Sequence, residues 1–574
     1  MSSTAQKTSA KPVAPLSSPV ASNAKARPEA GASTAGRQLL SGDSAIALGA
    51  LHGGVALGTG YPGTPSTEIL EYLSSVGGKA QWSPNEKVAL EVGIGVAYGG
   101  ARALVTMKHV GVNVAADPLF SVAHTGVVGA LVVVSADDPG MASSQNEQDN
   151  RRYAVAAAVP MLEPSDSQEA YDFTLAAIEI SERWKIPVLL RVTTRVCHTQ
   201  APVQPREVPF TVIAPHFERD LRGRNLIPSN ARPAHRRLRQ KLAEMTAWSE
   251  TTSLNQVVPG GKKLGIIVSG VSFMHAREAA PDASFLKLGF THPLPLKKIA
   301  DFVAGVERCV VIEEGDPYLA DAIRAAGLKV ESKPEMFRFG ELNVDRVRRI
   351  LAHDESPEPG RPAGRPPELC DGCSHHVVFQ ALKNLDCIVA GDIGCYALGV
   401  LPPYSAMDCC VCMGSSIGIG LGLRHVLPPD EARRVVSVIG DSTFVHSGMT
   451  GLAEMIYNRP PTGHVVVILD NSTTAMTGHQ EHPGTGRTLE HAPTGRVIYE
   501  DLGRALGIEK VHVLPLGKDC AEFQQMMKES LASEKLVLIV ARRPCVLAAK
   551  NIRDHKKITP CRLAIAGNAH ECCS

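Results

Sequence analysis

The sequence predicts an α/β protein of three domains built on mainly parallel sheets. Runs of aliphatic and β-branched residues alternate with stretches whose apolar residues recur at helical spacing. Several apolar runs end abruptly in small and polar residues, as at 435–442 (VVSVIGDS) and 465–473 (VVVILDNST). Because two parallel strands need a long crossover between them, this alternation favours βαβ units.

The composition is that of a folded protein without a nucleic-acid or membrane partner. The 59 basic and 58 acidic residues nearly cancel, so the chain lacks the electrostatic footprint of a nucleic-acid-binding protein. No apolar run reaches the roughly 18 residues that a membrane span requires. Fourteen cysteines and no recognisable secretory signal lead us to expect a reducing, cytoplasmic setting, with metal or redox use of the thiols.

The order of these patterns along the chain predicts the domain organisation. The first domain should have strands at 103–106 and 130–135 and helices at 66–74 and 87–99. The Ala-, Ser- and Pro-rich N-terminus favours a disordered tail, although a transit peptide has a similar composition. The predicted segments are a tail (1–37), a first α/β domain (38–202), a connector (203–262), a smaller α/β domain (263–352), a Pro/Gly-rich linker (353–368), a third α/β domain (369–545) and a C-terminal tail (546–574).

A metal site is predicted where two strands of the third domain end. The runs 435–440 and 465–470 flank a helical stretch at 447–458, and parallel strands present their carboxyl ends at one edge of a sheet. Asp441 and Asn471 should therefore lie side by side. A carboxylate, an amide oxygen and a backbone carbonyl, which we assign to Thr473, suit Mg²⁺. The alternative is an ordinary βαβ unit with these residues in turns.

A glycine-rich stretch near the start is a weaker signal. Residues 58–63 (GTGYPG) match G-x-G-x-x-G, but Pro62 and Pro65 indicate an extended turn and not the start of a helix. Residues 81–83 also lack the acid that would bind a ribose. A nicotinamide site is therefore disfavoured.

Four cysteines of the third domain are predicted to bind an iron–sulfur cluster. Cys370 and Cys373 form a Cys-x-x-Cys pair, Cys395 follows the strand 387–390, and Cys545 lies beyond another strand. Strand ends of one sheet can bring such positions together, and four thiolates hold a [4Fe–4S] cluster.

Two other interpretations of these cysteines stay open. The pair could be half of a zinc site, with His375 or His376 as a further ligand. The thiols could also be buried and inert. Nearby Cys409, Cys410 and Cys412 could supply a substitute ligand.

Several longer motifs carry a family resemblance. They are GYPGTPS (60–66), NEKVALE (85–91), DDPGMASSQNEQDNR (137–151) and LDNSTTAMTGHQ (469–480). Together with the Gly440-Asp441-Ser442 to Asn471 spacing, they make residues 38–548 resemble the large (alpha) subunits of indolepyruvate:ferredoxin oxidoreductases. That family belongs to the thiamine-diphosphate-dependent 2-oxoacid:ferredoxin oxidoreductases.

The resemblance implies a domain for each part of the cofactor. The first domain would bind the pyrimidine, the second would be transketolase-C-like, and the third would bind the diphosphate through Gly440, Asp441, Ser442, Asn471 and Thr473. Such sites usually form between two chains, so a dimer is implied.

The resemblance also implies roles for residues of the first domain. Glu86 would hydrogen-bond to the aminopyrimidine and activate the cofactor, with Glu91 as the fallback. Thr64 would hydrogen-bond to the carboxylate of the 2-oxoacid. Lys108, Arg151 and Arg152 are the candidates for the cation that this carboxylate needs. His109, His446 and His479, the last two from the third domain, lie in or beside the matching motifs and could transfer protons at neutral pH; of these, His446 is our catalytic candidate.

The implied reaction is the oxidative decarboxylation of an arylpyruvate-type 2-oxoacid, such as indolepyruvate, to its acyl-CoA. Electrons would leave through the [4Fe–4S] cluster to ferredoxin or another acceptor. The implied partners are coenzyme A and a smaller beta (gamma-domain-type) subunit, in a dimer of heterodimers. Cys561, Cys572 and Cys573 lack the spacing of the family's C-terminal ferredoxin domain, so we expect a separate electron-transfer subunit or a different acceptor.

Two rival functions remain. A non-oxidative thiamine-diphosphate 2-oxoacid decarboxylase or carboligase would need Glu86 and Asp441 but no iron. A non-catalytic subunit that retains the fold is the second rival.

Overall fold

The computed structural model describes residues 36–206, 214–360 and 367–549. The expected tails at 1–37 and 546–574 fall almost entirely outside these ranges, as do Cys561, Cys572 and Cys573. Three main sheets with helices on their faces confirm the α/β class with mainly parallel strands. Among the helices of the described ranges, none combines the length and apolarity that crossing a bilayer requires.

The first sheet has seven strands. Their spatial order is β12 (Phe290–His292), β6 (Met161–Leu162), β7 (Val188–Thr193), β5 (Leu131–Asp137), β4 (Ala103–Lys108), β2 (Leu57–Gly60) and β3 (Ala80–Trp82). All neighbours pair in parallel except β12 with β6. Strand β12 comes from the stretch predicted as the second domain, so the two domains share a sheet edge that the sequence pattern did not indicate.

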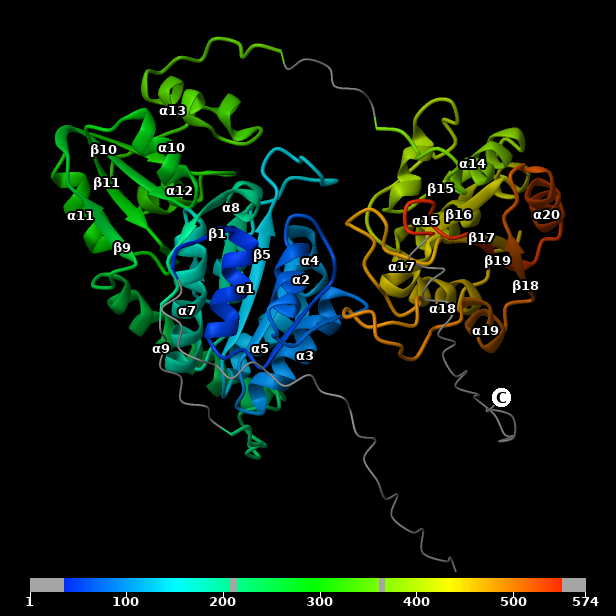
Figure 1. The fold of residues 1–574 in the computed structure, drawn as a ribbon, viewed down its shortest axis with the longest axis horizontal. Coiled ribbons are helices and arrows are strands. Elements are labelled where there is room, and N and C mark those ends of the chain that lie inside the picture. Colours follow the sequence, from blue (N-terminus) through cyan, green and yellow to red (C-terminus); the bar gives the residue numbers. More distant parts are fainter. Residues whose placement is uncertain (1–35, 207–213, 361–366, 550–574) are drawn as a thin grey trace, which may run out of the picture.

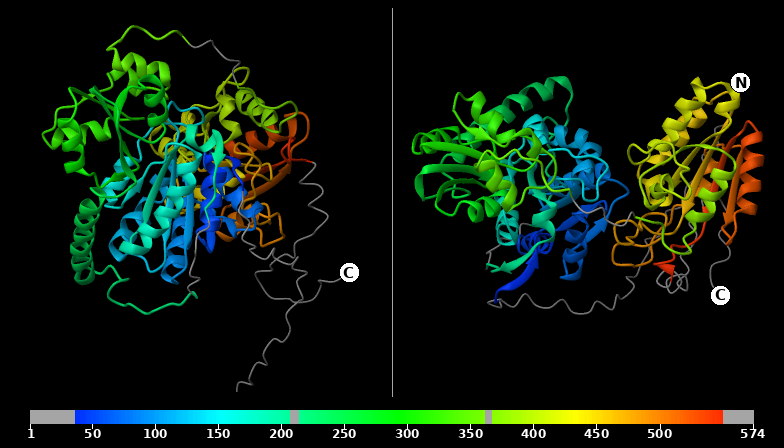
Figure 2. Two further views of the ribbon diagram at one scale, coloured as in Figure 1. Left: turned by 60° about the vertical axis from the view of Figure 1, so that its left-hand side comes forward. Right: turned by 90° about the horizontal axis from the view of Figure 1, so that it is seen from above.

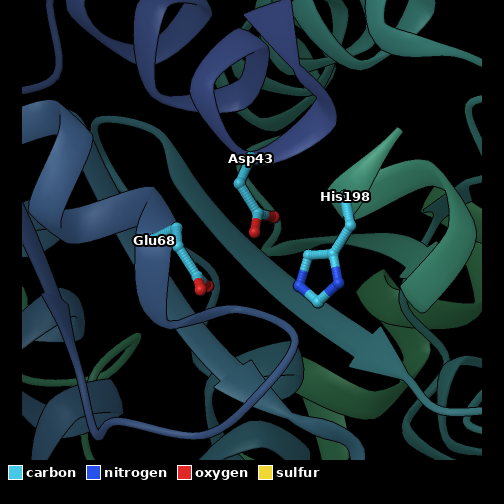
Figure 3. Close-up of side chains that lie close together, drawn as sticks. All are labelled: Asp43, Glu68 and His198. Carbon is cyan, nitrogen blue, oxygen red and sulfur yellow. The ribbon is translucent and has the colours of Figure 1, made fainter. Parts of the chain in front are cut away.

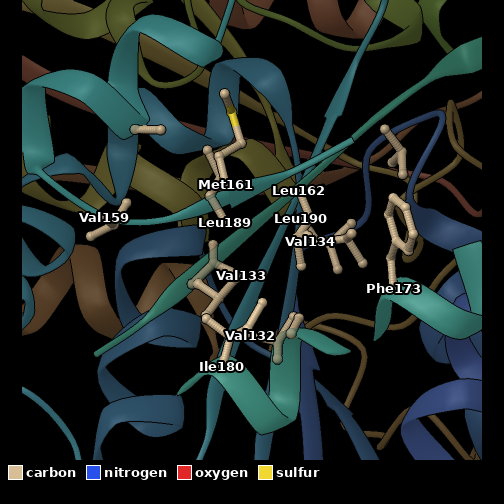
Figure 4. Packing of buried hydrophobic residues seen from close by; sticks show 14 of the residues in the cluster. Val132, Val133, Val134, Val159, Met161, Leu162, Phe173, Ile180, Leu189 and Leu190 are labelled. Carbon is tan, nitrogen blue, oxygen red and sulfur yellow. The ribbon is translucent and has the colours of Figure 1, made fainter. Parts of the chain in front are cut away.

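Helices cover this first sheet. They are α1 (Gly42–His52), α2 (Thr67–Ser75), α3 (Glu86–Tyr98), α4 (His109–Val114), α5 (Ala116–Thr125), α6 (Arg151–Ala157), α7 (Ser167–Trp184) and α8 (Thr194–His198). A two-stranded ribbon of β1 (Gln38–Ser41) and β8 (Gln200–Val203) joins the ends of this unit. Its core is a continuous cluster of aliphatic side chains from β5, β7 and the helices around them (Figure 4).

The second sheet has five strands and lies on the far side of the first domain from the third domain (Figures 1 and 2). Its spatial order is β14 (Glu331–Ser332), β13 (Arg308–Ile312), β10 (Gly261–Ser269), β11 (Ala283–Leu288) and β9 (Asn255–Val258), with only β9 antiparallel. Its other elements are α9 (Pro228–Ser249), which precedes it, α10 (Ser272–Ala279), α11 (Leu296–Ala304), α12 (Tyr318–Ala325), the 3-10 turn η1 (Glu335–Arg338) and α13 (Val344–Leu351). Strand β9 and the start of β10 fall in the stretch assigned to the connector.

The third sheet has five parallel strands. Its spatial order is β15 (Ile388–Ala390), β16 (Val435–Gly440), β17 (His464–Asp470), β19 (Leu536–Arg542) and β18 (Lys510–Pro515). The elements around it are α14 (His375–Asn384), the 3-10 turn η2 (Cys395–Val400), α15 (Ser415–Val426), α16 (Pro429–Ala432), α17 (Asp441–Thr443), the π-helical turn η3 (Phe444–Gly448), α18 (Met449–Tyr457), α19 (Tyr499–Ala505) and α20 (Ala521–Ala532).

The register of the third sheet follows from burial on both faces. Along β17, Val465, Val467 and Leu469 pack into one hydrophobic cluster, and Val466 and Ile468 pack into another on the opposite face. Gly440 of β16 pairs with Leu469 of β17. The residues that follow these two strands therefore leave the sheet at the same edge.

Candidate active site

A cavity of about 320 Å³ lies between the first and third domains. Its wall combines the loop after β2, the start of α3 and the end of β4 with the loops after β16 and β17. The predicted residues that line it are Thr64, Glu86, Lys108, Cys395, Gly440, Asp441, Ser442, Asn471 and Thr473. Both sides of the cavity belong to one chain, whereas the resemblance implied that two chains share such a site.

Glu86 begins α3 because Asn85 caps that helix, its side chain accepting a hydrogen bond from Val88 N. The Glu86 side chain is buried, yet one edge of it faces the cavity. Gly111 of α4 makes room for it, since a Cβ there would stand 2.6 Å from both Cγ and Oε1 of Glu86. The site therefore needs a glycine at 111 to hold this carboxyl group in place.

His446 connects Glu86 to the third domain. It lies in the turn η3, and its Nε2 is 2.8 Å from Glu86 Oε2. Its Nδ1 is 2.6 Å from Ser447 Oγ, and its backbone carbonyl accepts from Asn85 Nδ2 at 2.9 Å. The edge of the Tyr61 ring packs against the imidazole at 4.7 Å between centroids. Three contacts thus fix the imidazole ring, and the bond from Asn85 fixes the backbone of the same residue.

The alternatives to these two residues lie elsewhere. Glu91, the fallback acid, is on the exposed face of α3, where it pairs with Lys87. None of the candidate histidines His109, His446 and His479 lines the cavity itself. His109 is buried and bonds to Asn146, whereas His446 is the one that contacts Glu86. Glu86 and His446 are therefore the acid and the imidazole that the fold brings together.

Asp441 lies directly beyond the end of β16. Its Oδ1 accepts from Ser442 N at 2.9 Å, and its Oδ2 accepts from Ser472 N at 2.8 Å. Burial raises the pKa of Asp441. The imidazole of His482, whose Nε2 lies 3.4 Å from Asp441 Oδ2, reverses only part of this rise. A bound cation would offset the cost of this buried charge.

Asn471 lies beside Asp441 on the wall of the cavity. Its Oδ1 accepts from Thr473 N at 3.1 Å. A carboxylate, an amide oxygen and nearby backbone carbonyls form the all-oxygen donor set that Mg²⁺ takes in proteins. The residues present therefore fit a Mg²⁺-diphosphate group.

Ser442 joins the two domains. Its hydroxyl lies 2.8 Å from Tyr61 Oη and accepts from Thr474 Oγ1 at 2.8 Å. Burial keeps the pKa of Tyr61 well above its usual range, so the phenol stays neutral. Gln480 makes a second bridge by donating to Glu71 Oε1 at 2.8 Å. Sequence reasoning missed Tyr61, Gln480 and His482, because their contacts depend on how the domains dock.

The three candidate cations differ in their position relative to the cavity. Lys108 lines the cavity at the end of β4 and donates to Ser143 O at 2.7 Å. Its Cβ lies 3.0 Å from where a Cβ on Gly63 would stand, so it is next to the loop of Thr64. Burial lowers the pKa of Lys108, and Asp138 partly restores it.

The two arginines have other partners. Arg151 is fully buried and bonds to Asp149 and, at 2.7 Å, to Glu313 of the second domain. Arg152 is exposed and lies 3.5 Å from Asp321. Neither arginine lines the cavity, so Lys108 is the one of the three candidates that does.

The four predicted cluster cysteines converge from three segments. Cys395 lines the cavity. Burial raises the pKa of the Cys395 thiol to about 11, and the nearby thiols of Cys370, Cys373 and Cys545 contribute to this rise. Cys545 N donates to Asn471 O at 2.9 Å, so Cys545 adjoins the loop after β17 that carries Asn471. Thiols that disfavour one another's ionisation fit a cationic iron–sulfur group, which would favour the thiolates.

The zinc alternative has less support. His375 is buried with its ring against Tyr396, and burial lowers its pKa to about 4. His376 lies 2.5 Å from Tyr404 Oη and 3.0 Å from Cys370 O, so its ring nitrogens already have partners. Burial raises the pKa of Cys410 to about 11, and the ionisable neighbours that raise it further are Asp392, Cys409 and Cys412.

Comparison with known proteins gives matches over most of the chain. Residues 48–253 match the family "Pyruvate flavodoxin/ferredoxin oxidoreductase, thiamine diP-bdg", and residues 392–541 match "Thiamine pyrophosphate enzyme, C-terminal TPP binding domain". The indolepyruvate oxidoreductase subunit IorA of Archaeoglobus fulgidus is 38% identical over 546 residues, covering 88% of this chain and 86% of the relative. The same subunit of Methanothermobacter marburgensis is 39% identical over 557 residues, covering 90% and 88%.

Among solved structures, the 2-oxoglutarate:ferredoxin oxidoreductase of Magnetococcus marinus is similar with a TM-score of 0.48 at 17% identity, covering 55% of this chain and 65% of that one.

Proposed function

This chain belongs to the family of indolepyruvate oxidoreductase subunits IorA, and we propose that it is the catalytic subunit that oxidises indolepyruvate or a similar arylpyruvate to the acyl-CoA. The family makes it an enzyme of thiamine-diphosphate-dependent 2-oxoacid oxidation. The observation that carries the finer assignment is the shared cavity, which Glu86 and Asp441 both line.

The cavity has suitable groups for both halves of the cofactor. Asp441, Asn471 and the backbone at Thr473 would hold Mg²⁺ and the diphosphate, and Glu86 would face the aminopyrimidine. When bound, thiamine diphosphate supplies the carbon nucleophile that adds to the keto group and the electron sink that lets CO₂ leave.

Glu86 is the carboxyl group that would activate the cofactor. A carboxyl group in hydrogen-bond contact with the pyrimidine nitrogen favours the tautomer that can take up a proton. Because His446 binds Glu86 Oε2, the other oxygen, Oε1, would be the one available to the pyrimidine nitrogen. The backbone at Gly111 limits where Oε1 can move. This is a positioning role for His446 and Gly111 and a catalytic one for Glu86.

Lys108 and Thr64 would bind the substrate carboxylate. Both line the cavity, and the lysine ammonium is held by Ser143 O close to the Thr64 loop. A charge-assisted hydrogen bond from the ammonium orients the 2-oxoacid and offsets the loss of water around its carboxylate.

The cysteine quartet would hold a [4Fe–4S] cluster next to the cavity, with Cys395 belonging to both. Such a cluster accepts single electrons, which suits an oxidation that ends at ferredoxin or at a separate electron-transfer subunit. Coenzyme A would take the acyl group, and a smaller beta subunit would complete the enzyme.

An anaerobic assay of this chain with a co-expressed small subunit tests the proposal. We expect reduction of methyl viologen that requires both indolepyruvate and coenzyme A and yields the acyl-CoA. Release of the aldehyde without viologen reduction would support the non-oxidative decarboxylase instead. Cofactor binding without either product would support a non-catalytic subunit.

A further inference from the structure

Three potential metal ligands lie close together outside the cavity, at the start of the helix α2 that follows the loop of Thr64. Asp43 is in the first turn of α1, Glu68 is in the first turn of α2, and His198 is the last residue of α8. One ligand atom from each lies within 4.8 Å of the others, and Figure 3 shows the three side chains converging.

The second observation is the burial and sparse hydrogen bonding of the Asp43 carboxyl group. The Asp43 side chain is only 1% exposed, and neither carboxylate oxygen accepts a hydrogen bond from an N–H or O–H group of the described residues; its hydrogen-bonding neighbour is the weakly donating thiol of Cys197. Burial raises the pKa of Asp43 well above its usual range, the Cys197 thiol lowers it in part, and the charge of Glu68 raises it further. A buried carboxyl group with unused oxygens is costly unless a proton or a cation accompanies it. Figure 3 shows this carboxyl group directed between Glu68 and His198.

Helices α1 and α8, which carry Asp43 and His198, pack closely against each other. A Cβ on Gly42 would stand 2.1 Å from the carbonyl oxygen of Val196, so α1 packs directly on the backbone of α8. This contact fixes Asp43 relative to His198. Glu68 and His198 are exposed, which leaves a route for an ion from solvent and room for water ligands.

We propose that Asp43, Glu68 and His198 bind a divalent transition-metal cation of the Zn²⁺ type. Carboxylate oxygens and imidazole nitrogens are both ligands that Zn²⁺ accepts, and three protein ligands leave a fourth position for water. Mg²⁺ and Ca²⁺ take oxygen ligands, so the imidazole distinguishes this site from the proposed Mg²⁺ site at Asp441.

The position of the site suggests what the ion does. Helix α2 follows the cavity-lining loop directly, and Glu71, one turn after Glu68, accepts a hydrogen bond from Gln480 of the third domain. An ion at Glu68 would therefore fix α2 between α1 and the third domain and hold one wall of the cavity. It would take no part in the chemistry.

The test is a Zn²⁺ titration of the chelator-treated full-length chain in excess Mg²⁺, followed by bound zinc per chain and the shift in Tm. We expect a site that raises the Tm of the parent chain. Asp43→Asn and His198→Ala should each weaken Zn²⁺ binding by at least about tenfold. The matched control is Asp117→Asn, which removes an exposed first-turn acid from α5 and should leave binding unchanged.

Further controls keep the result interpretable. Cys373→Ser should retain this zinc, because the cysteine quartet is a different site. His198 is exposed, so its variant should fold, and metal-free Asp43→Asn should be at least as stable as the parent. Zinc binding that survives both Asp43→Asn and His198→Ala, or that is lost only in Cys373→Ser, would overturn the proposal. So would the absence of Zn²⁺ binding to the parent chain.

Discussion

Glu86 in α3 and His446 in η3 are 360 positions apart in the sequence, and their Oε2 and Nε2 atoms lie 2.8 Å apart across the boundary between two domains. Both side chains are buried, and Asn85 binds the backbone of His446 from the same helix start. One of the contacts that join the domains is therefore also the contact that orients the proposed activating acid. Docking and catalysis are linked in this arrangement.

Glu86→Gln should keep cofactor binding and lose turnover. The amide has the same shape but cannot supply the proton, so kcat should fall by roughly 10²–10⁴-fold. Steady-state kinetics and a thiamine diphosphate titration measure the two effects separately. Glu91→Gln is the matched control on the same helix and should behave as the parent. Parent-like kcat in Glu86→Gln would reject its role as the activating acid.

Gly111→Ala should lower kcat without abolishing folding. The added methyl group would stand 2.6 Å from Glu86 Oε1, so the carboxyl group has to shift. Gly95→Ala in α3 has open space around its Cβ, and it should raise the free energy of unfolding by about 0.5–1 kcal/mol with unchanged kcat. Equal kcat values in the two variants would show that the position of Glu86 tolerates movement.

Lys108 should make substrate binding dependent on pH. Because burial lowers its pKa, the ammonium loses its proton at a lower pH than an ordinary lysine, and KM for the 2-oxoacid should rise on that alkaline side. Lys108→Gln should raise KM about 10- to 100-fold at neutral pH. Lys108→Arg, which keeps its charge, should remove the alkaline rise. A neutral-pH KM unchanged in Lys108→Gln would exclude the lysine from the carboxylate site.

Arg151 and Arg152 should differ in stability and not in KM. Removing the buried Arg151 takes the guanidinium away from two buried carboxylates, Asp149 and Glu313, so Arg151→Gln should lower the free energy of unfolding by about 3–5 kcal/mol. Arg152→Gln should change it by less than about 1 kcal/mol, since its partner Asp321 is exposed too. Urea unfolding measures both. A large rise in KM for Arg151→Gln, with stability intact, would contradict the assignment.

Sequence patterns predicted the parts that depend on local structure. The strand ends at Gly440 and Asp470 follow from two apolar runs, and parallel pairing places Asp441 next to Asn471. The cysteines converge for the same reason, since Cys395 and Cys545 lie beyond strands of one sheet. These are consequences of short-range periodicity and of the rules of parallel sheets.

Features that depend on docking could not be predicted. The sequence around Tyr61 does not indicate a hydrogen bond to Ser442. The sequence around Arg151 does not indicate that this arginine will be buried and paired with Glu313. The edge pairing of β12 with β6 is likewise set by how the second domain packs. By charge alone, Lys108, Arg151 and Arg152 were equivalent candidates for binding the substrate carboxylate. Their positions and partners in the fold distinguish Lys108, which lines the cavity.

The most direct test of the central claim is the content of iron, acid-labile sulfide and thiamine diphosphate in anaerobically purified chain with its small subunit. We predict about four irons, four sulfides and one cofactor per chain. Cys373→Ser should lose the iron and keep the cofactor, and Cys410→Ser should keep both. Cofactor without iron in the parent preparation would contradict oxidation through a cluster and favour the non-oxidative decarboxylase.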